Sequence, residues 1–289
     1  MVMRLPSNFR IFSFSAKHRP ALKVKPNSII LFEVRDATDG QLNLYAEEPL
    51  NLEAIDRSRV NPATGPVWIE GALPGQTLEV DILDVKVGDR GHIGRKVLKI
   101  VNGFIEMGSI RIPVKPVIGV IGVAPPQGEI TTKDLGDYGG NLDTPDITIG
   151  SKVFLPIGVE GALLAMGDVH AAQGDGEVSG QGLEVPAEIK VKVKLHEGYV
   201  LNKVLVETES HLIVLASSET IDKAVDEALN AAKIILQKAL DISDREALEL
   251  LSLTSDLGIA QIVNPKKTVK VKIPKNIIPI KLENLLKNQ

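Results

Sequence analysis

The sequence predicts a mainly β protein whose C-terminal part is α+β. Through the first two hundred residues, glycine and proline separate short runs rich in Val, Ile and Leu, a pattern typical of strands in a β-sandwich or barrel. From Ile221 onward the apolar residues instead follow the spacing of one helix face. We therefore expect a β-rich region over residues 1–195 and a smaller α+β region over residues 196–289, with two helices packed on a small sheet.

Turn residues bound each predicted strand of the β-rich region. These strands cover residues 29–34, 67–70, 77–85, 110–114, 153–156 and 163–169. Strict alternation at 189–195 and 268–273 places aliphatic side chains on one face and lysines on the other. We interpret both runs as half-buried strands, either inside a sheet or at an edge that lysine protects, with a basic ligand patch as the alternative.

Two helices are predicted in the C-terminal part. The first has its apolar face at Ile221, Val225, Ala228, Ala232, Ile235 and Ala239. Ser243 and Glu246 form a capping box that begins the second helix, and Gly258 stands where a residue just after a helix end is expected. Strands near 200–215 and 259–273 are expected to flank these helices.

Composition excludes several classes of function. The chain has 33 basic and 37 acidic residues, which disfavours a nucleic-acid-binding protein. It contains no cysteine, so disulfides, thiolate metal sites and cysteine nucleophiles are excluded. Because no apolar stretch is long enough to cross a bilayer, we expect a cytoplasmic protein with no membrane partner. Lysine-protected sheet edges would also suit a homo-oligomer.

The segment from 163 to 184 concentrates residues that can perform chemistry. Asp168 and His170 are two positions apart, so on a strand they point to the same face and could share one metal ion. The turn signal Gly-Asp-Gly at 174–176 then predicts a hairpin that returns Glu177 and Glu184 beside them. Each residue alone has an ordinary structural explanation, but their concentration favours a site.

Two further clusters are acidic and rich in turn residues. The first, at 136–146, contains Asn141 and Asp143, and the second, at 33–41, contains Asp36 and Asp39. A plain loop explains either cluster equally well. The other histidines, His18, His92, His196 and His211, lack a carboxylate at ligand spacing and are expected to be surface or hydrogen-bonded residues. Nucleotide-binding, HExxH and GxSxG motifs are absent from the sequence.

Long segments resemble the acetamidase/formamidase family. They include NPATGPVWIEGALPGQTLEVDILDVKV at 61–87, IPVKPVIGVIGVAP at 112–125 and SLTSDLGIAQIVNPKKTVKVKIPK at 252–275. The most specific is GGNLDTPDITIGSKVFLPIGVEGALLAMGDVHAAQGDGEVSGQGLEV at 139–185. In one departure, family members often have a cysteine after the first aspartate of an Asp-Cys-x-x-Gly-Gln pattern, whereas this chain has Ala37 after Asp36.

The resemblance implies metal-dependent hydrolysis of a short-chain amide, such as formamide or acetamide, to a carboxylate and ammonia. In this interpretation Asp143, Asp168 and His170, with Asp36, hold a divalent ion, either zinc or calcium, with magnesium or manganese as alternatives. Glu184 or Glu177 acts as general base, and Asn141 stabilises the oxyanion. Two alternatives are a non-catalytic β-rich protein that binds a metal or small ligand, and a structural subunit whose clusters only form turns.

Overall fold

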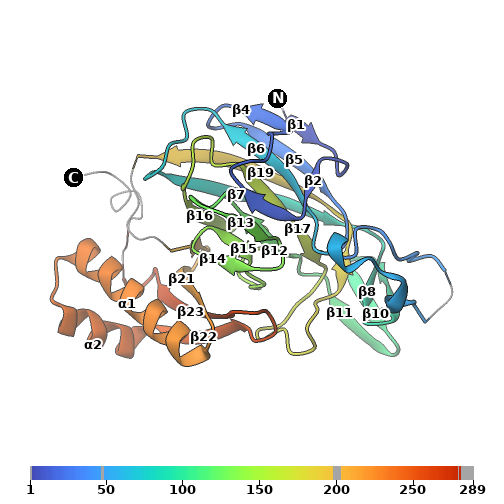
Figure 1. Ribbon diagram of the computed structural model, residues 1–289. Helices are drawn as coiled ribbons and strands as arrows, with labels where there is room; N and C mark the ends of the chain where they lie inside the picture. Colours follow the sequence, from blue (N-terminus) through green and yellow to red (C-terminus); the bar gives the residue numbers. More distant parts are fainter. Residues whose placement is uncertain (1, 47–48, 198–202, 279, 281–289) are drawn as a thin grey trace.

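The computed structural model describes residues 2–46, 49–197, 203–278 and 280 (Figure 1). Two large β-sheets make up most of this part of the chain, and two α-helices pack at its C-terminal end. The predicted fold class, mainly β with an α+β C-terminal part, is confirmed. The beginning of the strand predicted near residue 200 lies outside the described residues.

The first large sheet has nine strands among the described residues and runs through both predicted regions. Their spatial order is β1 (Val2–Leu5), β5 (Ile29–Val34), β19 (Ala187–His196), β7 (Thr77–Val87), β16 (Lys152–Pro156), β20 (Leu205–Glu207), β21 (His211–Ser218), β23 (Lys267–Pro274) and β22 (Asp256–Gln261). Antiparallel pairing of β16 with β20 joins strands from both sides of residue 196. The small sheet expected near the C-terminus is therefore the end of this larger sheet.

The second large sheet carries the chemically interesting segments. Its main path runs β11 (Ile110–Pro113), β10 (Phe104–Met107), β9 (Lys96–Val101), β8 (Arg90–Ile93), β18 (Glu184–Val185), β17 (Leu164–His170), β12 (Val117–Gly122), β15 (Gly139–Asn141) and β14 (Leu135–Gly136). Three more strands, β6 (Ala63–Ile69), β2 (Arg10–Ile11) and β4 (Leu22–Val24), join it through the pairing of β6 with β17. A two-stranded sheet pairs β13 (Glu129–Thr131) with β3 (Ser13–Ser15), and short 3-10 helices cover Leu52–Ala54 and Arg57–Arg59.

The main hydrophobic core contains side chains from both large sheets. Phe32 and Ile189 come from the nine-stranded sheet, and Ile118 and Val169 come from the other. All four are fully or almost fully buried. This arrangement agrees with the sandwich-like packing predicted from the short Val/Ile/Leu runs, because each sheet must bury one apolar face against another layer.

The C-terminal region has a second core beneath the helices α1 (Ile221–Leu240) and α2 (Asp244–Thr254). Ala228 and Ile235 of α1 pack there with Val271 of β23, and Figure 1 shows the two helices side by side at the end of the sheet. The predicted capping box at Ser243 is confirmed, since its hydroxyl accepts from the Glu246 N–H and the Glu246 carboxylate accepts from the Ser243 N–H.

Gly258 does not end the second helix, contrary to the sequence-based prediction. That helix ends at Thr254 with an extended cap at Ser255, and Gly258 lies inside β22 opposite Lys270. A Cβ at Gly258 would lie 3.2 Å from the Lys270 Cε. The glycine therefore makes room for the lysine side chain that crosses it.

The lysine-bearing strands are interior strands, so the edge interpretation is wrong. Strand β19 lies between β5 and β7, and β23 lies between β21 and β22. Acidic residues of β7 compensate the lysines of β19: Lys194 contacts the carboxylates of Glu79 and Asp81. Charge pairing with the neighbouring strand therefore explains Lys194 of β19. On β23, which is mostly buried, Lys270 and Lys272 instead contact Asp146, which lies outside the strands.

Within the described residues, neither helix has the length and the hydropathy needed to cross a membrane.

Candidate active site

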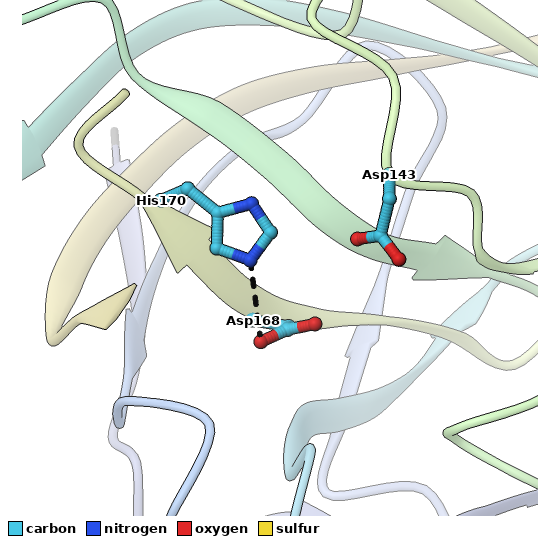
Figure 2. Close-up of side chains that lie close together, drawn as sticks. All are labelled: Asp143, Asp168 and His170. Carbon is cyan, nitrogen blue, oxygen red and sulfur yellow. Dashed lines mark ion pairs between the residues drawn. The ribbon is translucent and has the colours of Figure 1, made fainter. Parts of the chain in front are cut away.

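The predicted Asp168–His170 pair lies at the end of β17, and both side chains are almost fully buried. The His170 Nε2 is 3.7 Å from the Asp168 Oδ1, the ion pair drawn in Figure 2. The other ring nitrogen, Nδ1, is 2.8 Å from the Gln173 Oε1. The Gln173 Oε1 accepts a hydrogen bond from the Nδ1–H, so Nε2 is the ring nitrogen that faces the carboxylates.

Two glutamates approach the same imidazole, as the predicted return of the chain requires. Strand β18 pairs with β17 so that Glu184 is opposite His170, and its Oε1 is 3.3 Å from the His170 Nε2. Glu177 comes from the loop between these strands, with its Oε1 at 3.9 Å from the same nitrogen. A Cβ at Gly182 would collide with the imidazole, so a glycine there permits this close packing.

Asp143 completes the cluster from the segment that follows β15. It lies beside Asp168 and His170 (Figure 2), and the ligand atoms of these three residues fall within 4.8 Å of one another. Gly119 of β12 allows the two aspartates to approach, since a Cβ there would be 2.5 Å from the Asp143 Oδ1 and 3.1 Å from the Asp168 Oδ2. Asn141, the predicted oxyanion donor, lines the same cavity.

The remaining predicted ligand, Asp36, lies outside these close groups. Its Oδ1 accepts a 2.8 Å hydrogen bond from the Thr38 N–H, and it is buried. The charges of Asp36 and Asp168 both act to raise the pKa of His92, although burial lowers it overall. Asp36 is thus connected to the cluster through His92 and does not contact His170 directly among the described contacts.

The cluster opens into a polar cavity of about 470 Å³. Asp143, Asp168, His170, Glu177 and Glu184 all line it. A cavity of this size, with convergent polar groups, is typical of a small-molecule site.

A family model describes this chain well: the model of the acetamidase/formamidase family matches residues 16–107 and 126–279. The chain belongs to the acetamidase/formamidase family. The family members it resembles include an acetamidase from Bacillus halodurans, of which the crystal structure is 35% identical with a TM-score of 0.91, covering 96% of this chain and 99% of that one.

A predicted acetamidase/formamidase from Thermoanaerobacter tengcongensis is similar to the same degree. Its structure is 36% identical with a TM-score of 0.93, covering 96% of this chain and 97% of that one. The formamidase of Methylophilus methylotrophus is 26% identical over 60% of this chain and 60% of its own length. The chain described here spans about three fifths of the length of the curated relatives that it matches.

Burial shifts the pKa values of the acidic residues strongly. Desolvation is the largest cause, and neighbouring carboxylates add to it, raising the pKa of Glu177 to about 9, of Glu184 to about 8 and of Asp143 to about 7. Burial alone would lower the pKa of His170, but the charges of Glu184 and Asp168 outweigh it and raise that pKa well above 6.5. The cluster holds more acid than its own imidazolium can neutralise, which favours an additional cation.

Four residues of the polar cavity have a left-handed backbone. Asn61, Asp143, Asp168 and Glu177 have φ values of 51°, 42°, 51° and 46°. This conformation costs a non-glycine residue on the order of 1–3 kcal/mol, and it persists where the surrounding structure imposes it. Its concentration among these four side chains is typical of a functional site.

His92 is the residue that sequence reasoning most clearly misjudged. It is fully buried on β8, opposite Glu184, and neither ring nitrogen has a hydrogen-bond partner among the described residues. Burial lowers its pKa, and this keeps the imidazole neutral and able to ligate a cation. The two carboxylates whose charges act on His92, Asp36 and Asp168, are distant from it in the sequence, so the local sequence could not indicate them.

Two asparagines were also missed as site residues. The Asn61 Nδ2 donates to the Asp168 Oδ2 at 2.9 Å, and the Asn264 Nδ2 donates to the Asp143 Oδ2 at 2.5 Å. Asn264 lies in the hairpin loop between β22 and β23 of the C-terminal region. Since it is 121 residues away from Asp143 in sequence, no local spacing could have indicated this contact.

Proposed function

We propose that this protein hydrolyses a linear amide to a carboxylate and ammonia at the buried cluster around His170, with a divalent ion bound there. The observation that carries the proposal is the convergence of four carboxylates on one enclosed imidazole inside a cavity of about 470 Å³. Membership of the acetamidase/formamidase family supports amide hydrolysis as the reaction. A cytoplasmic homo-oligomer stays a prediction from the sequence.

The residues fit a divalent cation. Buried oxygens of Asp143, Asp168 and Glu184 have no hydrogen-bond partner within the described chain, and His170 presents Nε2 to them. Hard carboxylate oxygens with one imidazole suit zinc, calcium, magnesium or manganese. We assign the ion to Asp143, Asp168, His170 and Glu184, with His92 and Asp36 as further ligands. When bound, such an ion acidifies water and polarises a carbonyl oxygen.

Proton transfer is the role we assign to Glu177. Its Oε1 lies 3.9 Å from the His170 Nε2 in the cavity wall, and a cation bound beside it would lower its pKa from about 9 toward neutrality. The carboxylate would then take the proton from the attacking water and give it to the amide nitrogen. The water oxygen then bonds to the carbonyl carbon, the C–N bond breaks, and ammonia leaves with that proton. Glu184 is the alternative base, but its contact with His170 also suits a ligand. A positioned acid–base group contributes roughly 10²–10⁴-fold to the rate.

Asn141 is the proposed oxyanion donor. Its amide lies in the cavity wall next to Asn264, whose Oδ1 is 3.4 Å from the Asn141 Nδ2. This long contact leaves the Asn141 N–H groups free to strengthen a bond to a substrate oxygen as charge develops on it. One such donor is worth roughly 10²–10³-fold.

The decisive experiment is ammonia release from formamide and acetamide by purified protein. It is run before chelation, after dialysis against EDTA, and after restoration of zinc, calcium, magnesium or manganese one at a time. We expect activity to be lost on chelation and restored by at least one ion. Activity that is indifferent to EDTA would contradict the metal role alone. Metal binding without ammonia release would favour a non-catalytic binding protein.

A further inference from the structure

A second cavity, of about 380 Å³, lies between the arm formed by β8–β11 and the loop that follows β17. Most of its wall is aliphatic. The apolar lining residues are Ile93, Leu98, Ile105, Met107, Ile112, Ala172, Val178 and Leu183. The cavity is open to solvent, since Val178 and Met107 of its wall are 81% and 40% exposed, and its volume has room for an apolar ligand.

The apolar cavity shares wall residues with the polar cavity of the candidate active site. Glu177 and Gln181 line both. Gln173 lines the apolar cavity and also holds the cluster: its Oε1 is 2.8 Å from the His170 Nδ1, and its Nε2 donates to the Asp143 carbonyl at 2.8 Å. The residue assigned to proton transfer therefore stands at the boundary between the polar and the apolar compartment.

This division matches the two ends of an amide. The carboxamide is polar and must reach the carboxylate cluster, whereas an acyl chain gains free energy on leaving water for aliphatic surroundings. Formamide and acetamide carry zero and one carbon beyond the carbonyl, too few to occupy a second compartment. Only a longer acyl chain has carbons that could lie beyond Glu177, among Leu98 and Ile105 of the apolar wall.

We propose that the apolar cavity binds the acyl chain of the substrate, so that the preferred substrates are aliphatic primary amides longer than acetamide. The inference rests on the proposed amidase function and specifies its substrate class. Leu98 and Ile105, on neighbouring strands of the arm, then determine how long an acyl chain the site accepts.

The test is a series of kcat/KM values for ammonia release from formamide, acetamide, propionamide, butyramide and hexanamide with metal-loaded protein. Burying one methylene group in an apolar cavity raises kcat/KM about fourfold, so we expect values that increase steadily toward hexanamide. Values that stay flat or fall beyond acetamide would overturn the inference and leave the amidase function standing. Hydrolysis of none of the five amides would overturn both.

A variant that fills the cavity separates binding of the chain from general effects. We expect Leu98→Trp to lower the ratio of kcat/KM for hexanamide to that for acetamide at least tenfold. Leu257→Trp is the matched control, because Leu257 also lies on a strand and lines a cavity, of about 240 Å³, under the C-terminal helices. This control should keep the wild-type ratio. An equal loss on both amides in Leu98→Trp would contradict an acyl site.

Inhibition by carboxylate products is a second test, which does not depend on turnover of the long amide. Hexanoate should inhibit acetamide hydrolysis competitively with an inhibition constant at least tenfold lower than that of acetate. In Leu98→Ala, which enlarges the cavity and avoids overpacking, the advantage of hexanoate over acetate should shrink several-fold because contacts with the chain are lost. Equal inhibition by the two anions in the wild type would overturn the proposal.

Discussion

The carboxylates and the imidazole that line the polar cavity all come from the β-rich region, whereas the C-terminal region lines it with Asn264 and Pro265 and supports it with lysines. Lys270, almost fully buried on β23, bonds to Asp146 and to Asp175, each at 2.6 Å. Lys266 donates to the Leu135 carbonyl at 2.9 Å. The β-rich region therefore carries the reactive groups, and the C-terminal region holds the segments that carry them in place.

The loop that carries Glu177 shows this division most clearly. The Gly176 N–H donates to the Ala260 carbonyl at 2.8 Å, and the Ile262 N–H donates to the Gly176 carbonyl at 3.1 Å. Together with the Lys270–Asp175 ion pair, these bonds attach the loop to β22 and β23. Removing a reactive group and removing a support should therefore have effects of different size and kind.

The largest expected effect follows removal of a charge from the cluster. Asp168→Asn keeps the size of the side chain but removes its negative charge, so we expect kcat/KM to fall by about 10³-fold or more and bound metal to be lost. Metal content by mass spectrometry and ammonia release measure the two effects. Asp256→Asn, at an exposed position on β22, is the control and should change neither. Full activity in Asp168→Asn would remove Asp168 from the site.

The next effect concerns stability of the metal-free protein. Glu177, Glu184 and Asp143 have pKa values of about 9, 8 and 7 in the folded chain, above their ordinary values near 4, so the folded state binds more protons than the unfolded state at neutral pH. The raised pKa of His170 acts in the same direction. Stability should therefore fall as the pH rises from about 5 to about 9.

Thermal unfolding of EDTA-treated protein across this pH range checks the sign. A saturating divalent ion should remove most of the decline, because the ion favours the ionised carboxylates and binds the folded state. A Tm of the metal-free protein that rises with pH over this window would contradict the close packing of these acids. Asp168→Asn should show a weaker decline than the wild type.

A support is expected to matter less than a ligand. Lys270→Met removes the cation between Asp146 and Asp175, so we expect the free energy of unfolding to fall by about 1–3 kcal/mol. Because the loop with Glu177 loses one attachment, we also expect kcat/KM of this variant to fall about tenfold while the metal stays bound. Lys272→Met is the control, since Lys272 contacts Asp146 alone of these two aspartates. Equal kinetic losses in the two variants would exclude positioning of the loop by Lys270.

The parts of the site that the sequence predicted lie close together along the chain. Asp168 and His170 are neighbours on one strand, and the Gly-rich turn at 174–176 predicts the return of Glu184, so alternation and turn chemistry suffice. His92 and Asn264 reach the cluster by pairing between distant segments. Local periodicity contains no information on which strands become neighbours, and an isolated histidine then resembles a surface residue.

Features of the fold were likewise predicted where the signal is local and missed where it depends on distant segments. The bounds of β5 and the start of α1 agree with prediction, because turn residues and helix periodicity mark them locally. The sequence did not decide between an interior and an edge position for β19, since its lysines resemble those of a protected edge until Glu79 and Asp81 are found on the neighbouring strand. Gly258 was misassigned for a similar reason: the group that needs its small size is Lys270, on another strand.

The smallest expected effect lies in the helices, away from the site. Ser243→Ala removes the cap of α2 and should lower the free energy of unfolding by about 1 kcal/mol. Denaturant unfolding measures this change, with Ser252→Ala, an exposed position within α2, as control. Because the helices cover their own core and no described residue of theirs lines the polar cavity, kcat/KM for amides should stay at the wild-type value. A loss of activity in proportion to stability would show that the helices also position the loop with Glu177. The supporting part of the molecule would then include the second core beneath the helices.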